Sequence, residues 1–154
     1  MENVNRKPKV LPVLKKPPSV LLVAATYYPD ITDKLIEGAL QVLQKVNASV
    51  EKVEVPGALE IPTAIKFASD KFSGFVALGC VIRGETSHYE TVTTDSSQAL
   101  SQLGLAGLCI GNGILTVENR EQAINRADPL VQNKGGGAAE ALISLIAIKE
   151  KFSL

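Results

Sequence analysis

Apolar runs alternate with amphipathic segments along most of the chain. Three nearly continuous apolar runs occupy residues 19–29 (SVLLVAATYYP), 72–82 (FSGFVALGCVI) and 106–116 (AGLCIGNGILT). Such runs are typical of strands that are covered on both faces. The segment SVEKVEVPGALEIP, which starts at residue 49, predicts a further strand that ends at Pro56-Gly57.

The segments between these strands have helical periodicity. Residues 32–46 (TDKLIEGALQVLQKV) predict a helix, and Thr32 or Asp33 can cap its start. Its apolar positions that fall on one face are Leu35, Ile36, Ala39, Leu40, Leu43 and Val46. Further helices are predicted at about residues 60–70, 89–102 and 117–127 and within 133–152, where a loop precedes the helix.

Strands and helices therefore alternate, with two helices at the end. This order predicts an α/β protein with a parallel sheet, helices on both faces and right-handed crossovers. We expect a flavodoxin-like three-layer sandwich whose four strands follow the order 2-1-3-4. One domain, residues 19–154, accounts for the whole pattern. Residues 1–18 contain Pro8, Pro12, Pro17 and Pro18 and are predicted to form an extended arm, because proline disfavours helices and central strands.

Composition narrows the class of protein only slightly. Hydrophobic residues make up 45% of the chain, and 16 basic residues balance 16 acidic ones, so no net field attracts nucleic acid or an anionic membrane. The basic arm leaves a polyanion contact open as an alternative. No apolar run reaches the length of about 18 residues that a membrane span needs. The N-terminus lacks the apolar core of a signal peptide, so we expect a cytoplasmic protein.

Cysteine and histidine are too few for several kinds of site. The chain has two cysteines, Cys80 and Cys109, and a single histidine, His88. Both cysteines fall in predicted strands, which favours buried free thiols over a disulfide framework. We expect no metal site and no cofactor.

Polar residues and glycines gather where the predicted strands end. These positions are Tyr27-Tyr28, residues 56–60, residues 83–88 and residues 111–113. Because ligands bind at the carboxyl edge of open α/β sheets, the four clusters predict one binding pocket. Each also has a purely structural reading: Tyr27 can plug the sheet, the glycines can serve turns, and Glu60 can favour a helix N-terminus.

His88 follows the segment GETS at the predicted start of a helix. Backbone N–H groups and the positive end of the helix dipole favour an anion there, and Thr86 and Ser87 add hydroxyl donors. The segment matches neither GxxxxGK[ST] nor GxGxxG. A surface histidine is one interpretation, and proton transfer beside a bound anion is the other. Arg126 and Lys134 are either solvated charges or ligands of a phosphate.

Four segments together resemble the lumazine synthase family. VPGALEIP, LGCVIRGETSHYETV, GNGILTVENREQA and NKGGGAAEA occur in the order and spacing of that family, and the likeness extends from about Val20 to Phe152. The resemblance implies condensation of 5-amino-6-(D-ribitylamino)uracil with 3,4-dihydroxy-2-butanone 4-phosphate. The product would be 6,7-dimethyl-8-ribityllumazine, with release of phosphate and water. It implies no cofactor and two small-molecule substrates.

The resemblance also implies residue roles. For the pyrimidine and its ribityl chain it implies stacking by Tyr27, contacts from Ala58, Leu59 and Glu60, and recognition by the backbone of Cys80, Val81 and Ile82. For the phosphate it implies a binding turn at Glu85 and Thr86 and an ion pair with Arg126, with Lys134 nearby. It implies proton transfer by His88 during the condensation. It also implies that an adjacent subunit contributes Asn112 to the site. Many members have aromatic residues at the positions of Leu59 and Asn112 and threonine at Cys80.

The family places its active sites between subunits of a homopentamer, and some members assemble an icosahedral 60-mer. Prolines in the arm oppose the N-terminal strand that adds to a neighbour's sheet in shell-forming members. We therefore expect an isolated pentamer. Two other functions stay open: an archaeal-type riboflavin synthase and a non-catalytic lumazine- or flavin-binding protein. An FMN-binding electron carrier shares the fold alone.

Overall fold

The computed structural model describes residues 10–153 and contains one parallel sheet. Its four strands are β1 (Ser19–Ala25), β2 (Ser49–Val55), β3 (Gly74–Ile82) and β4 (Ile110–Val117). They follow the order β2-β1-β3-β4, and every neighbouring pair is parallel. The predicted α/β class and strand order are thus confirmed.

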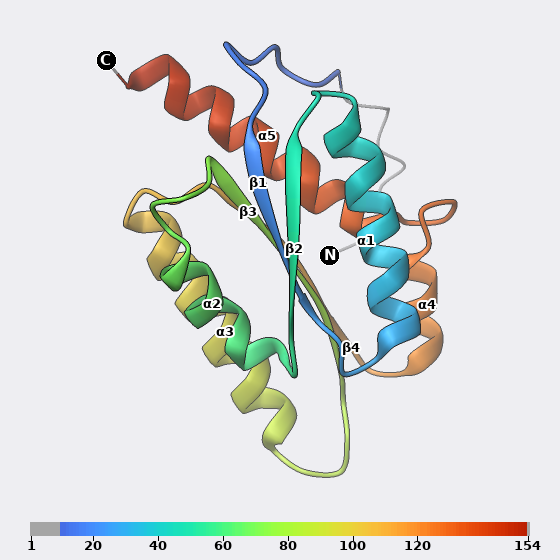
Figure 1. Ribbon diagram of the computed structural model, residues 1–154. Helices are drawn as coiled ribbons and strands as arrows, with labels where there is room; N and C mark the ends of the chain where they lie inside the picture. Colours follow the sequence, from blue (N-terminus) through green and yellow to red (C-terminus); the bar gives the residue numbers. More distant parts are fainter. Residues whose placement is uncertain (1–9, 154) are drawn as a thin grey trace.

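Helices cover both faces of the sheet, as Figure 1 shows. One face carries α1 (Pro29–Gln44), α4 (Arg120–Ala127) and α5 (Lys134–Phe152). The other carries α2 (Ile61–Phe67), α3 (His88–Leu105) and the short 3-10 turn η1 (Ala58–Glu60). Parallel strands need such crossovers, and the result is the predicted three-layer sandwich.

The core consists of two clusters, one on each face of the sheet. Alternate residues of β1 point to opposite sides: Leu22 packs in the α1 and α5 layer with Leu142, whereas Val23 packs in the α2 layer with Ile61. Both layers bury β3, in which Val76 and Ala77 are fully inaccessible. The continuous apolar runs of the sequence reflect this burial on two sides.

The first helix differs from its predicted start and face. It begins at Pro29, so Thr32 does not cap it but lies inside it and donates its buried hydroxyl to Ala25 O at 2.7 Å. Leu40, predicted on the apolar face, is 41% exposed, and Val42 is buried in its place. The buried positions Leu35, Ala39, Val42 and Leu43 follow the spacing i, i+4, i+7, i+8, which leaves Leu40 at the edge of the packed face.

The placement of Gly111, Asn112 and Gly113 at the end of a strand was wrong. These residues lie near the start of β4, where Asn112 pairs with Ala77 of β3. A Cβ atom on Gly111 would lie 2.0 Å from Ala138 O. The two glycines therefore let α5 approach the strand closely, which is a packing function that resembles a loop signal in sequence.

The arm is described from residue 10 onward, so Pro8 and the rest of residues 1–9 lie outside the described part. Residues 10–18 contain no helix or strand. Leu11 and Leu14 pack against the cluster formed with α1 and α5, and Lys15 N donates to Glu150 Oε2 at 3.0 Å. Within residues 10–153, no helix is long and apolar enough to cross a membrane.

A matched pair of glycines in α5 tests the close packing of α1 against α5. A Cβ on Gly135 would lie 2.0 Å from Leu35 O, whereas one on Gly137 would meet no atom within 4 Å. We expect Gly135→Ala to lower the free energy of unfolding by about 1–3 kcal/mol. We expect Gly137→Ala to raise it by about 0.5–1 kcal/mol, because alanine favours helix. Urea unfolding followed by circular dichroism at one protein concentration measures both; equal effects would contradict the packing account.

Candidate active site

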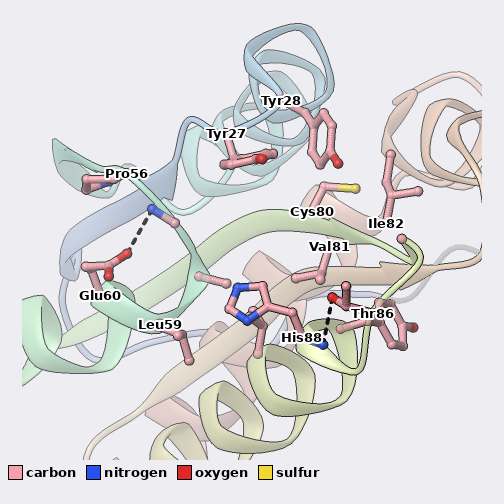
Figure 2. A pocket seen from close by; sticks show the side chains of 15 residues that line it. Tyr27, Tyr28, Pro56, Leu59, Glu60, Cys80, Val81, Ile82, Thr86 and His88 are labelled. Carbon is pink, nitrogen blue, oxygen red and sulfur yellow. Dashed lines mark hydrogen bonds between the residues drawn. The ribbon is translucent and has the colours of Figure 1, made fainter.

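A pocket of about 430 Å³ opens at the carboxyl edge of the sheet, a volume that fits a small-molecule ligand. Its walls come from the segments that leave β1, β2 and β3 and from the first turns of α3, as Figure 2 shows. The lining residues are Tyr27, Tyr28, Pro56, Gly57, Ala58, Leu59, Glu60, Cys80, Val81, Ile82, Gly84, Thr86, His88, Tyr89 and Val92. Parallel strands bring these distant segments together, because they all end at this edge.

Most of the predicted site residues line this pocket, and four do not. The lining includes the predicted residues Tyr27, Ala58, Leu59, Glu60, Cys80, Val81, Ile82, Thr86 and His88. Glu85 is exposed in the same loop as Thr86 but outside the lining. Asn112 lies on β4, Arg126 on α4 and Lys134 at the start of α5. A single chain therefore does not bring these last three to the pocket.

Tyr89 and Val92 are lining residues that sequence reasoning missed. Both belong to the first two turns of α3, which begins at His88. The helical spacing of His88 and Val92 places them on one face, and this signal in the sequence was not used. Tyr28, Pro56, Gly57 and Gly84, which belong to the strand-end clusters of the sequence, also line the pocket.

The turn after β2 is closed by the side chain of Glu60. Its Oε2 atom accepts a hydrogen bond from Gly57 N at 2.9 Å, and Figure 2 shows this contact at one wall of the pocket. Gly57 has extended backbone and is followed directly by η1. The hydrogen bond fixes Ala58 and Leu59 against the pocket, and it leaves the remaining carboxylate oxygen as an acceptor for a ligand hydroxyl.

His88 stands at the junction of the loop and α3. Its backbone N–H donates to Thr86 Oγ1 at 3.3 Å, and Figure 2 shows its imidazole directed toward the middle of the pocket. The Ser87 side chain makes no capping hydrogen bond to α3. The positive end of the dipole of this 18-residue helix favours an anion at its first turn. Proton transfer and anion binding can therefore occur side by side.

Two tyrosines form an aromatic wall opposite α3. Their rings meet edge to face, with centroids 5.0 Å apart. Tyr27 is 72% exposed, which leaves a ring face free to stack on a planar ligand. Burial, and next the neighbouring Tyr27, raise the pKa of Tyr28, so this phenol stays neutral and can donate a hydrogen bond.

Cys80 lines the inner wall of the pocket. Figure 2 shows its sulfur near the end of β3, below Tyr28. Both cysteines are buried and free, as predicted. Burial raises the pKa of the Cys80 thiol to about 11, and burial also raises the pKa of Cys109. Cys80 is therefore a neutral pocket wall at physiological pH rather than a nucleophile.

Within residues 10–153, no group of three or more His, Cys, Asp or Glu side chains is arranged to hold a metal ion. The pocket instead offers an aromatic wall, a backbone floor, a carboxylate and an imidazole next to a helix N-terminus. The molecule is thus an α/β sandwich protein with a pocket that can accommodate a planar polar molecule together with an anionic group.

The family model described as 6,7-dimethyl-8-ribityllumazine synthase matches residues 17–150. The chain belongs to the 6,7-dimethyl-8-ribityllumazine synthase family. Proteins with that name are similar over nearly their whole length. The one from Bartonella tribocorum is 54% identical over 143 residues, which cover 90% of this chain and 95% of the relative. The one from Jannaschia sp. is 52% identical, over 92% of this chain and 81% of the relative. The one from Zymomonas mobilis is also 52% identical, over 86% of this chain and 97% of the relative.

The raised pKa of Cys80 predicts its reactivity. At pH 7 a thiol with a pKa of about 11 is ionised to roughly one part in ten thousand, and only the thiolate is alkylated. We expect the rate of iodoacetamide alkylation at Cys80 to rise about tenfold per pH unit between pH 7 and 9. Peptide mass spectrometry measures the rate, and Cys80→Ser identifies the peptide. A rate that levels off below pH 9 would show a stabilised thiolate.

Proposed function

We propose that this protein condenses 5-amino-6-(D-ribitylamino)uracil with 3,4-dihydroxy-2-butanone 4-phosphate to 6,7-dimethyl-8-ribityllumazine, releasing phosphate and water. Membership of the family over residues 17–150 supports this reaction. Within the molecule, the pocket supports it, because one cavity is lined by tyrosine rings, the Glu60 carboxylate and the His88 imidazole. Much of the catalysis is then orientation of two reactants.

The pyrimidine substrate occupies the wall between the tyrosines and β3. Tyr27 stacks on the ring, and the backbone of Cys80, Val81 and Ile82 provides hydrogen bonds to its edge. Ala58, Leu59 and Glu60 contact the ribityl chain. The second carboxylate oxygen of Glu60, which does not bind Gly57 N, can accept hydrogen bonds from the ribityl hydroxyls. Leu59 is 39% exposed, so it offers the ligand an aliphatic contact where many members have an aromatic ring.

The phosphate-bearing substrate places its anion at the turn that contains Glu85 and Thr86. His88 stands at the same helix terminus and moves protons as the imine forms and phosphate leaves. General acid–base catalysis by one such group contributes about 10²–10⁴ in rate. None of the pocket-lining residues is Lys or Arg, so this part of one chain offers the phosphate no basic side chain.

A second subunit completes this site in our proposal. Arg126, Lys134 and Asn112 lie on β4, α4 and α5, away from the lining of their own chain's pocket. In a cyclic homopentamer, a head-to-tail interface carries these residues to the pocket of the next subunit. Leu105 and Leu130 are 92% and 94% exposed, which supports a subunit interface, because large exposed apolar side chains favour burial.

We also propose an isolated pentamer in the cytoplasm. Residues 1–18 contain Pro8, Pro12, Pro17 and Pro18, and proline cannot donate the backbone hydrogen bonds with which an N-terminal strand would join a neighbour's sheet in an icosahedral 60-mer. Within the described part, residues 10–18 form no strand. The domain that follows, residues 19–154, contains all of the proposed site residues. Neither nucleic acid nor a membrane is a proposed partner.

Two assays test the reaction against its alternatives. We expect the protein to form 6,7-dimethyl-8-ribityllumazine and inorganic phosphate in equal amounts from the two substrates, followed by lumazine absorbance and a phosphate assay. Incubation with lumazine alone should give no riboflavin, whereas an archaeal-type riboflavin synthase would produce it. Binding of lumazine without formation of product in either assay would identify a non-catalytic carrier.

Paired variants test the shared site. We expect His88→Ala to lower kcat by about 10²–10⁴ while lumazine still binds, and Arg126→Ala to raise KM for the phosphate-bearing substrate. When the two impaired variants are co-expressed and assayed at a low concentration of the phosphate-bearing substrate, about a quarter of the sites combine an intact His88 with an intact Arg126 from the next subunit. Activity should return to that fraction. No recovery, with mixed oligomers verified by mass spectrometry, would place both residues in one chain's site.

A further inference from the structure

Arg83 makes three side-chain contacts at the point where β3 ends. Its Nε donates to Glu118 Oε2 at 2.7 Å, and its Nη1 donates to Glu90 Oε1. The guanidinium also lies 4.1 Å from the centre of the Tyr89 ring. Its backbone N–H donates to Val117 O at 3.0 Å, which continues the pairing of β3 with β4. Arg83 itself does not line the pocket.

These contacts join three segments around the anion-binding turn. Glu118 directly follows β4, and Tyr89 and Glu90 belong to the first turn of α3, next to His88. Tyr89 lines the pocket as well. Arg83 therefore connects the edge of the sheet to the helix terminus that carries His88. The planar guanidinium suits this role, because it can fork to two carboxylates and stack on a ring at once.

The charges of this cluster do not balance. One guanidinium faces two carboxylates, and its hydrogen bond lowers the pKa of Glu90. Glu90 is also the acidic residue of the first turn of α3, where the helix dipole attracts negative charge. Without its partner, this carboxylate would repel a phosphate bound at the same turn, and Glu118 would add to the repulsion.

We propose that Arg83 is a positioning residue for the phosphate-bearing substrate: it neutralises the carboxylates of Glu90 and Glu118 beside the anion-binding turn, so that they do not repel the phosphate. This inference rests on the proposed function. Exposed ion pairs contribute little to stability, and the side chains of Arg83, Glu90 and Glu118 are all more than a third exposed. The effect of Arg83 thus falls on ligand binding rather than on folding.

Arg83→Gln tests the proposal through separate Michaelis constants. We expect KM for 3,4-dihydroxy-2-butanone 4-phosphate to rise about tenfold, because two nearby carboxylates lose their countercharge. KM for the ribitylamino-uracil should change less than about twofold, and so should kcat, since neither substrate's other contacts are altered. The melting temperature should stay within a few degrees. Equal increases in both KM values, or none, would overturn the proposal.

Charge rescue separates this role from a structural one. In Arg83→Gln/Glu90→Gln/Glu118→Gln the repulsion is removed together with the arginine, so KM for the phosphate-bearing substrate should return to within about threefold of the parent. Arg120→Gln is the matched control: it removes another arginine that is paired with a carboxylate, Asp30, at the same edge of the sheet. KM in that variant should be unchanged. A triple variant as weak as Arg83→Gln would contradict the electrostatic account.

Inorganic phosphate provides a readout that does not depend on turnover. Phosphorus NMR titration should show phosphate binding about tenfold more weakly to Arg83→Gln than to the parent. The difference in affinity should grow as the salt concentration is lowered, because the unpaired carboxylates are then less screened. If the parent forms no lumazine but its phosphate binding still depends on Arg83, the proposed function fails and the positioning role stands. Normal turnover with unchanged phosphate binding in the variant refutes the positioning role alone.

Discussion

The parallel placement of β3 between β1 and β4 is the constraint on which the rest of the structure depends. Because β1, β2 and β3 run in one direction, their exit segments meet at one edge and form the walls of a single pocket. Cys80, Val81 and Ile82 extend beyond the pairing of β3 with β1, and their pairing with Leu115, Thr116 and Val117 of β4 holds their backbone where it reaches the pocket. A rigid backbone is a better template for a planar ligand than a mobile loop.

Close contact between helices and sheet maintains this arrangement on the opposite face. Gly111 and Gly113 allow α5 to lie directly on β4, and Gly135 allows its first turn to approach Leu35 of α1. Side chains at these positions would push the helix away from the sheet. The glycine-rich segments therefore belong to the packing of the α1 and α5 layer rather than to the pocket walls, although the family motifs contain both.

Sequence alone predicted the strand order, the pocket's location and most of its lining, because these follow from alternation and from where strands end. It failed where local signals have two physical causes. Gly111-Asn112-Gly113 was interpreted as a strand exit, since glycines flanking asparagine are typical of turns, and only the packing of α5 shows otherwise. Tyr89 has no role in the sequence analysis, although the predicted helix begins there, because the side of the helix that faces the pocket depends on how the loop after β3 places it.

The distribution of charge separates what one chain can do from what requires two. The pocket lining contains Glu60 and His88 but no Lys or Arg, and the nearby Arg83 is already occupied by two carboxylates. A dianionic phosphate at the first turn of α3 thus has backbone N–H groups and hydroxyls as donors but no free countercharge from the same lining. In the proposed assembly, binding energy for the phosphate depends on a cation from outside the lining, for which we propose Arg126 of a neighbouring subunit. This dependence would couple catalysis to assembly: a dissociated subunit could still hold a planar ring against Tyr27, but it would bind the phosphate-bearing partner weakly.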